Sequence, residues 1–300
     1  MVSVIVCTYN PRSDYLERCI EAIVHQVRDR PDREFFIVDN ASRAPVTDLP
    51  IVRRHAISVV SEPRPGLTAA RECAARTATH DLLVFVDDDN VLAPGYLDAA
   101  LELFRDDRIG VLSGRVEPEY EVTPPAWFTR FEESIAIRRL ATDWLYVTSI
   151  PEYNRYFPIG AGCCIRRDLL RSYFDRLEEV DRIEGRRGTA LSAGEDTDIA
   201  LFAIADGYLV GSCGRLRVTH LVPRRRTEPE YLVALNRGAL ESAFRVNAKW
   251  QPKFGQNVFS FCGESRRLVL LRTLAYGLLS FSSPYRVRFR GQLDLLRLRH

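Results

Sequence analysis

The stretch LLVFVDDDN, Leu82–Asn90, decides the fold, because five apolar residues run directly into three aspartates. A short apolar run bounded by polar residues is typical of a strand buried within a sheet. Alternate side chains of a strand share a face, so we expect Asp87 and Asp89 on one side and Asp88 on the other. Paired carboxylates favour a hard divalent cation, Mg²⁺ or Mn²⁺. The alternative is a solvated acidic turn without a ligand.

The remainder of the first half alternates between strand and helix patterns. Short strands that alternate with helices are typical of an α/β fold with a mostly parallel sheet flanked by helices. The polar segments CTYN, DNAS and DDDN each follow a predicted strand. Sheets of this type bind ligands beyond the carboxyl ends of their strands, so we expect one polar site at this edge. The predicted strands are 2–7, 34–39, 56–61 and 82–86, and the predicted helices are 16–27, 66–78 and 94–104.

Two later segments carry further candidate site residues. Glu195 and Asp196 begin a predicted helix, where they either cap the helix or include a general base. The polar, glycine-containing segment 178–196 is expected to form a mobile loop around them. His220 ends the strand-like RLRVTH; a lone histidine is more often a surface or core residue, and it becomes a metal ligand only if a metal is bound elsewhere in the site.

Charge is distributed unevenly behind a net value of +2. Residues 215–300 contain 15 Arg, 2 Lys and 5 acidic residues, giving +12, whereas residues 1–214 carry −10. A basic segment favours an anionic partner such as a membrane surface, a nucleic acid or an acidic substrate. Its arginines lack the interleaved aromatic residues of a single-strand binder, so we expect no nucleic acid.

The basic segment also contains predicted helices at 230–244 and 266–281. No run of 18 apolar residues is present, so a membrane-spanning helix is not expected. The 266–281 helix is apolar with flanking arginines, which suits peripheral contact with an anionic membrane. The alternatives are that it packs on the protein or forms a homodimer.

The cysteines and the N-terminus indicate a compartment. The seven cysteines are odd in number and include no C-x-x-C, which predicts reduced thiols in a cytosolic protein. Met1 leads directly into a predicted strand, so no signal peptide is expected. We expect a cytoplasmic location, with peripheral contact at the inner face of the plasma membrane left open.

Taken together, residues 1 to about 245 resemble glycosyltransferase family two, whose fold is usually called GT-A. The opening VSVIVCTYNP is similar to the family's nucleotide-binding first strand, IVDNAS to its base-contacting segment, and GLTAARE to the stretch whose arginine lies near the nucleotide. The resemblance implies nucleotide-binding roles for Thr8, Tyr9, Asn10, Asp39 and Arg71.

The same resemblance implies roles for the acidic motifs. VDDDN is similar to the family's Asp-x-Asp (DXD) signature, with Asp89 as the direct metal ligand, Asp87 near the ribose or the metal, and Asp88 beside the nucleotide. GED resembles the family's Glu-Asp pair, which makes Asp196 the catalytic base with Glu195 beside it. VTH resembles the late metal-binding histidine, here His220.

The implied activity is metal-dependent, inverting transfer of one sugar from a nucleotide sugar, with UDP as the expected nucleotide. The Gln-x-x-Arg-Trp motif of processive members is missing. We expect a lipid-linked or glycan acceptor, in cell-surface polysaccharide or glycolipid biosynthesis. The expected domains are a catalytic domain over 1–228, with a nucleotide-sugar half at about 1–115 and an acceptor half at about 116–228, and a basic helical region over 229–300.

Two other functions remain open from the sequence alone. A sugar nucleotidyltransferase also uses aspartates with Mg²⁺, but it carries a glycine-rich loop after its first strand, where this chain has CTYNPRSDY. A non-catalytic protein that binds sugar nucleotides is the second alternative, although every predicted catalytic position is occupied.

Overall fold

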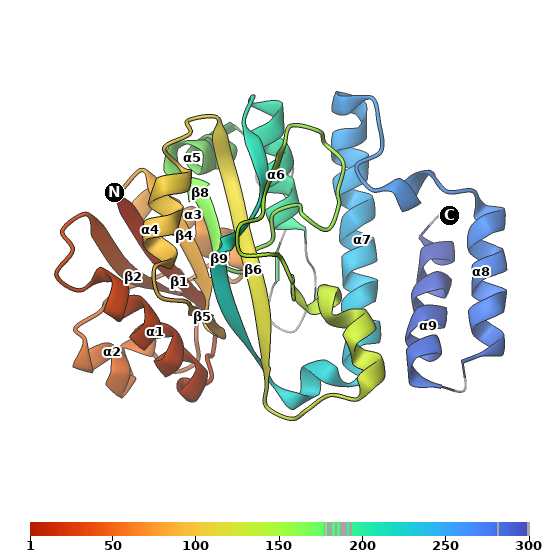
Figure 1. Ribbon diagram of the computed structural model, residues 1–300, viewed down its shortest axis with the longest axis horizontal. Coiled ribbons are helices and arrows are strands. Elements are labelled where there is room, and N and C mark those ends of the chain that lie inside the picture. Colours follow the sequence, from red (N-terminus) through yellow and green to blue (C-terminus); the bar gives the residue numbers. More distant parts are fainter. Residues whose placement is uncertain are drawn as a thin grey trace.

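A mixed sheet runs through the centre of the computed structural model, with helices on both faces (Figure 1). The structure describes residues 1–176, 178, 182–183, 185–186, 191, 194–280 and 282–298. Within these residues nine strands form one sheet, in the order β3-β2-β1-β4-β8-β6-β9-β5, with β7 paired to β9. Most of the expected mobile loop at 178–196 lies outside the described residues.

The four N-terminal strands form the parallel part of the sheet. They are β1 (Val2–Thr8), β2 (Arg33–Asp39), β3 (Ser58–Ser61) and β4 (Leu82–Asp87). In this register Thr8 lies opposite Asp39, and Cys7 lies opposite Asp87. The polar residues that follow these strands therefore meet at one carboxyl edge, as the sequence predicts.

The second part of the sheet mixes parallel and antiparallel pairs. Strand β8 (Cys163–Arg166) is antiparallel to β4 and to β6 (Ile109–Tyr120), whereas β9 (Leu209–Val222) is parallel to β6. The short strand β5 (Asn90–Leu92) pairs antiparallel with β9 and places Asn90 opposite His220. This pairing, which the sequence did not predict, brings the aspartates next to His220. Strand β7 (Leu145–Thr148) pairs antiparallel with the first residues of β9.

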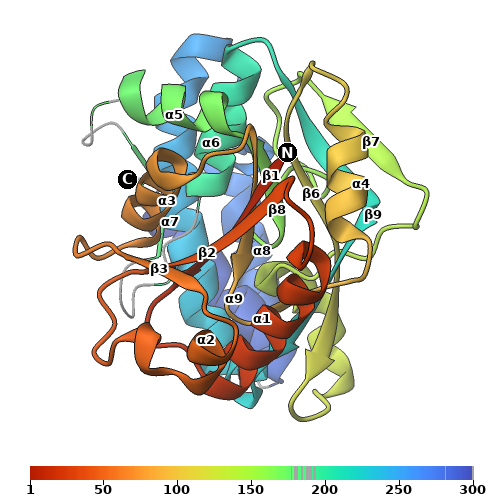
Figure 2. The ribbon, with the colours of Figure 1, turned by 90° about the vertical axis from the view of Figure 1, so that its left-hand side faces the viewer.

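Alternating apolar residues of the strands bury two cores, one on each face of the sheet. Val2, Val4 and Val6 face the core formed with α1 (Ser13–Val27), α2 (Pro50–Arg54) and α4 (Tyr96–Leu103). Residues such as Ile5 and Phe85 face the core formed with α3 (Leu67–Thr77), α5 (Arg167–Arg176) and α6 (Glu195–Ala205). Figure 2 shows these two sets of helices on either side of the strands.

Three helices form the C-terminal region: α7 (Pro229–Phe254), α8 (Arg266–Leu278) and α9 (Ser283–Arg297). Helix α7 packs into both cores, and α9 contacts α7 on one side and α8 on the other (Figure 1). Among the described helices, none has the combined length and apolarity needed to cross a bilayer. The domain boundary at residue 228 stays a prediction.

Candidate active site

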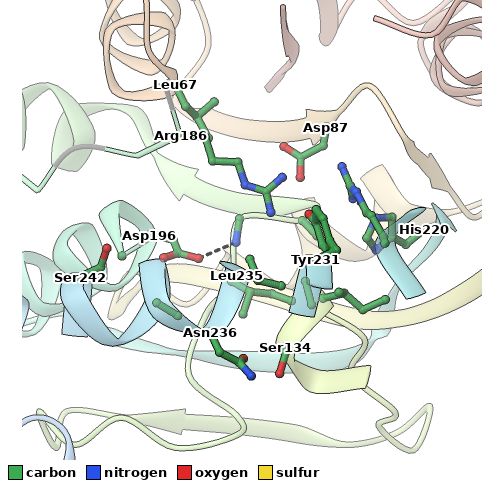
Figure 3. Close-up of a pocket in the computed structure, with 18 of the residues that line it drawn as sticks. Leu67, Asp87, Ser134, Arg186, Asp196, His220, Tyr231, Leu235, Asn236 and Ser242 are labelled. Atoms are coloured by element: carbon green, nitrogen blue, oxygen red, sulfur yellow. Dashed lines mark hydrogen bonds between the residues drawn. The ribbon is translucent and has the colours of Figure 1, made fainter. Parts of the chain in front are cut away.

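A cavity of about 1470 Å³ lies at the carboxyl edge of β1 and β4. Its polar side is formed by the ends of these strands, the start of α6 and the short 3₁₀ helix η4 (Arg224–Thr227). Its opposite side is formed by α7 and α9. Figure 3 shows Asp87, Arg186, Asp196 and His220 pointing into this space from separate elements.

The three aspartates all line the cavity, so the expectation that Asp88 points away is wrong. Strand β4 ends at Asp87, and Asp88 and Asp89 form a turn before β5, so the alternation of strand side chains does not reach them. The Thr8 hydroxyl donates a hydrogen bond to the Asp88 carboxylate. Asp89 is only 8% exposed, which is unusual for a carboxylate.

The electrostatics of this turn favour a bound cation. Burial, reinforced by the charge of Asp89, raises the pKa of Asp88 to about 7. The same two causes raise the pKa of Asp87. Burial, the largest single cause, acts in the same direction on Asp89, but Arg226, His220 and Arg186 together outweigh it and lower the pKa of Asp89. Three carboxylates in one turn repel one another, and additional positive charge would relieve this repulsion.

Asp89 and His220 lie together at the end of β9. Nε2 of His220 is 3.6 Å from Oδ2 of Asp89. The backbone N–H of Leu221 donates to the carbonyl oxygen of Asp89 at 2.8 Å, which holds the turn against β9. Asn90 Nδ2 donates to the second carboxylate oxygen of Asp89 at 2.5 Å.

A carboxylate and an imidazole are suitable ligands for Mn²⁺ or Mg²⁺. Mg²⁺ is commonly held by one or two protein groups together with substrate phosphates and water, so Asp89 and His220 fit such an ion when a diphosphate is bound. In the described part of the chain, no three His, Cys, Asp or Glu side chains form a metal-binding group. Asp87 therefore remains only a predicted third ligand.

Asp196 faces the same cavity from the first turn of α6. Its Oδ2 accepts a hydrogen bond from the backbone N–H of Gly160 at 3.0 Å, and Oδ1 accepts one from the N–H of Thr197 at 2.8 Å. Helix N-termini favour carboxylates because unpaired N–H groups point outward there. The half-buried carboxylate is thus oriented by two backbone contacts and retains free lone pairs for a substrate.

Glu195 is turned away from solvent and paired with Arg71. Nη1 of Arg71 and Oε1 of Glu195 are 2.9 Å apart and form an ion pair. Both residues are buried. Burial raises the pKa of Glu195 to about 7, even though Arg71 acts to lower it. Arg71 therefore links α3 to the start of α6 beneath the cavity.

Two glycines permit this close packing. A Cβ at Gly160 would lie 2.8 Å from Nη2 of Arg71, so any side chain there would displace the arginine. Gly194 precedes α6 with φ +118°, a conformation that other residues rarely adopt. These positions fix where the Glu195–Asp196 pair enters the site.

A second acidic residue of α6, Asp198, is fully buried and joins three helices. Its Oδ2 accepts from the Tyr173 hydroxyl of α5 at 2.6 Å and from Nζ of Lys249 at 2.8 Å. Its Oδ1 accepts from Nε1 of Trp250 at 2.6 Å. Because Lys249 and Trp250 belong to α7, one carboxylate ties α7 and α5 to the helix that carries Asp196.

The predicted nucleotide-binding residues divide into two groups. Thr8, Tyr9, Asn10 and Arg71 line the cavity. Asp39 instead accepts hydrogen bonds from the backbone N–H groups of Ser42 and Val46, at 3.1 and 3.2 Å. Among the described residues Asn40, rather than Asp39, lines the cavity. The base contact assigned to Asp39 stays a prediction.

Two arginines at the site were missed by sequence reasoning. Arg226 forms an ion pair with Asp89, with Nη2 and Oδ2 2.8 Å apart. Arg186 points toward Asp87 (Figure 3), and its carbonyl oxygen accepts from the N–H of Leu67 at 3.0 Å. The run of three arginines just after His220 could have indicated Arg226, whereas no local pattern indicates Arg186.

The C-terminal helices supply a largely apolar side of the cavity. Helix α7 contributes Leu235, Ala239 and Val246, and α9 contributes Val287 and Leu295. The cavity thus has a charged half and an apolar half.

Known proteins resemble this chain in sequence and in fold. The model of the family described as Glycosyl transferase family 2 matches residues 3–174, more than half of the chain. The chain is 29% identical over 126 residues to the succinoglycan biosynthesis protein ExoM of Rhizobium meliloti (strain 1021), covering 41% of this chain and 40% of that protein. It is 24% identical over 283 residues to polypeptide N-acetylgalactosaminyltransferase 15 of Homo sapiens, covering 88% and 42%. The chain therefore spans about two-fifths of the length of these curated relatives.

Solved structures confirm the expected α/β fold of the GT-A type. One is the mannosyltransferase PcManGT from Pyrobaculum calidifontis in complex with GDP-Man and Mn²⁺, at 22% identity and a TM-score of 0.53, covering 98% of this chain and 84% of that one. Another is GalNAc-T7 with UDP, GalNAc and Mn²⁺, at 15% identity and a TM-score of 0.54, covering 84% and 50%.

Proposed function

Because the chain belongs to glycosyl transferase family 2, we propose that it transfers one sugar from a nucleotide sugar to an acceptor hydroxyl, with inversion at the anomeric carbon. The observation that carries this proposal is the position of Asp196. Its carboxylate is held by Gly160 and Thr197 and faces the same cavity as the aspartate turn. A base and a cation-binding edge on one cavity suit a displacement in which a diphosphate leaves.

The charged half of the cavity is proposed to bind the donor. Thr8, Tyr9 and Asn10 would contact the nucleoside, with UDP as the expected nucleotide. Asp89 and His220 would hold a divalent ion, Mn²⁺ or Mg²⁺, which neutralises charge on the departing diphosphate. The two similar structures contain Mn²⁺ with GDP-Man or with UDP and GalNAc, which supports this class of donor.

The proposed step uses Asp196 as the general base. A carboxylate oxygen of Asp196 accepts the proton of the acceptor hydroxyl while the hydroxyl oxygen attacks the anomeric carbon. The bond from this carbon to the diphosphate oxygen breaks as the new glycosidic bond forms. The nucleoside diphosphate leaves with the bonding electron pair, and the proton remains on Asp196.

The acceptor is proposed to be lipid-linked and to be reached at an anionic membrane. Helix α8 exposes a leucine face, whose members are between 47% and 82% exposed: Leu268, Leu270, Leu271, Leu274 and Leu278. Arg267 and Arg290 are exposed on α8 and α9. Tyr276 of α8 lines the cavity, so the same helix carries both the leucine face and part of the proposed acceptor side. ExoM, named for succinoglycan biosynthesis, supports a role in polysaccharide or glycolipid synthesis.

A screen of nucleotide sugars with Mn²⁺ tests the proposed function. We expect one UDP-, GDP- or dTDP-sugar to raise the thermal midpoint in the presence of Mn²⁺ and to be hydrolysed slowly without acceptor. The anomeric configuration of the product, read by NMR, tests inversion. Absence of any metal-dependent shift with these donors would contradict the proposal. Nucleoside triphosphates are included because their consumption would instead support a nucleotidyltransferase.

A further inference from the structure

Arg226 contacts both residues that would hold the metal. Its Nη2 lies 2.8 Å from Oδ2 of Asp89, and its Nη1 lies 2.7 Å from Nε2 of His220. The guanidinium side chain is only 15% exposed. One protein cation therefore occupies both ligand atoms that a divalent ion would need.

The contact also orients the imidazole of His220. A guanidinium group donates hydrogen bonds and cannot accept them, so Nε2 of His220 must be the acceptor. The Nε2 lone pair, which a metal ion would use, is therefore directed at Arg226. Arg226 thus keeps Asp89 and His220 oriented toward a cation before any metal arrives.

We infer that Arg226 is a positioning residue that exchanges with the metal ion: it holds Asp89 and His220 while the donor is absent, and it moves onto the donor diphosphate when the ion takes these two ligands. This inference rests on the proposed function. A guanidinium within about 3 Å of both ligands cannot stay beside a divalent ion, because the like charges repel strongly in a buried site. The diphosphate gives the displaced guanidinium a bidentate partner.

The exchange makes metal and nucleotide binding cooperative. Without nucleotide, the ion must displace Arg226 and has only the two ligands Asp89 and His220, since within the described residues no metal-binding group of three His, Cys, Asp or Glu side chains is formed. With nucleotide, phosphate oxygens complete the ligand set and Arg226 gains a new partner. By linkage, the diphosphate raises metal affinity by the same factor as the metal raises diphosphate affinity, typically about 5- to 150-fold.

A purely structural role for Arg226 predicts a different result. If the arginine only anchors η4 to the end of β9, its loss should weaken metal and nucleotide binding alike. Exchange predicts opposite signs, because removing Arg226 removes a competitor for the metal and a ligand for the diphosphate.

The test measures Mn²⁺ affinity of the full chain by electron paramagnetic resonance of free Mn²⁺, alone and with saturating UDP, GDP or dTDP. For wild type we expect at least about fivefold tighter Mn²⁺ binding with one of these nucleotides. For Arg226→Ala we expect tighter Mn²⁺ binding than wild type without nucleotide, and a coupling factor close to one. Arg217→Ala is the matched control, since it removes the same charge from an exposed residue of β9 that is not among the residues lining the cavity, and it should behave as wild type.

Arg226→Lys separates charge from geometry. It should keep the competition with Mn²⁺ but lose the bidentate contact, so Mn²⁺ affinity without nucleotide stays near wild type while coupling falls. Equal or weaker Mn²⁺ binding by Arg226→Ala, with wild-type circular dichroism, would overturn the exchange and leave the proposed function standing. If wild type itself binds no Mn²⁺ with any of the three nucleotides, both proposals fail.

Discussion

The carboxyl edge of β1 and β4 buries charge, whereas the outer face of α8 exposes leucine. At the first, Asp89 is 8% and Glu195 4% exposed; at the second, Leu278 is 82% exposed. Both arrangements are unfavourable for a chain folding alone, since buried charges lose hydration and exposed apolar groups stay in water. In the proposed function an external component completes each region: a cation with a diphosphate at the first, and a membrane at the second. We therefore attribute the buried charges and the exposed leucines to binding rather than to a gain in folding stability.

Asp196→Asn tests the proposed general base of the first region and has the largest expected effect. The amide cannot accept the acceptor proton, so we expect turnover to fall by about 10²- to 10⁴-fold. Nucleotide affinity should change less than about twofold, as measured by calorimetry with Mn²⁺. Asp168→Asn is the matched control, because Asp168 lies in the first turn of α5 but is exposed. Near-normal turnover of the Asp196 variant would exclude it as the base.

Asp89→Ala tests whether buried charge serves a metal. The change removes one of the two proposed protein ligands of the metal. We therefore expect nucleotide affinity measured with Mn²⁺ to weaken by at least roughly 10- to 100-fold, because residues that merely contact a metal ligand already contribute this much to metal affinity. Calorimetry without metal serves as the reference and should differ little between variant and wild type. Unchanged Mn²⁺-dependent binding would place the metal elsewhere.

Leu271→Asn combined with Leu274→Asn tests the second region. These side chains are 64% and 60% exposed, so their loss should affect folding little. If they enter a lipid interface, vesicle binding should weaken by roughly tenfold or more, given about 1.5–3 kcal/mol for full burial of a leucine. Co-sedimentation with anionic vesicles measures this. The double change Leu145→Asn with Ile150→Asn, at residues 48% and 59% exposed elsewhere, is the control. If both double variants and the wild type bind the vesicles equally, α8 does not contact the membrane.

Glu195→Gln has the smallest expected effect. It tests how the buried Arg71–Glu195 pair makes the free energy of unfolding depend on pH. Burial raises the pKa of Glu195 from 4.5 to about 7, so between these values the folded chain keeps a proton that the unfolded chain has lost. The free energy of unfolding should therefore fall as pH rises, by up to about 1.4 kcal/mol per pH unit from this group. Urea unfolding at about pH 5 and 7 should show a shallower pH slope in the variant. Identical slopes would mean that Glu195 is ionised throughout.

The two regions also differ in how far sequence predicts them. Strands β1, β2 and β4 and their polar ends follow from apolar runs, because a buried parallel strand needs little beyond its own residues. The positions of Asp88 and Asp89 do not follow, since where β4 ends depends on the pairing of β5 with β9. The contacts of Arg226 with Asp89 and of Arg186 with Leu67 join segments that are far apart in the sequence, so local periodicity does not predict them.

The carboxylate of Asp198 has a consequence for how the molecule opens. It accepts hydrogen bonds from Tyr173 of α5 and from Lys249 and Trp250 of α7, while lying in α6 itself. Separating α7 from α6 would leave the charge of Asp198 unpaired in the core, and separating α5 would remove one of its hydrogen bonds; both changes are costly. Amide hydrogens in all three helices should therefore exchange with deuterium through a shared opening event, as one cooperative unit. In that case the proposed catalytic base would never be released alone, and the enzyme would lose its active-site helix only together with the apolar wall of α7.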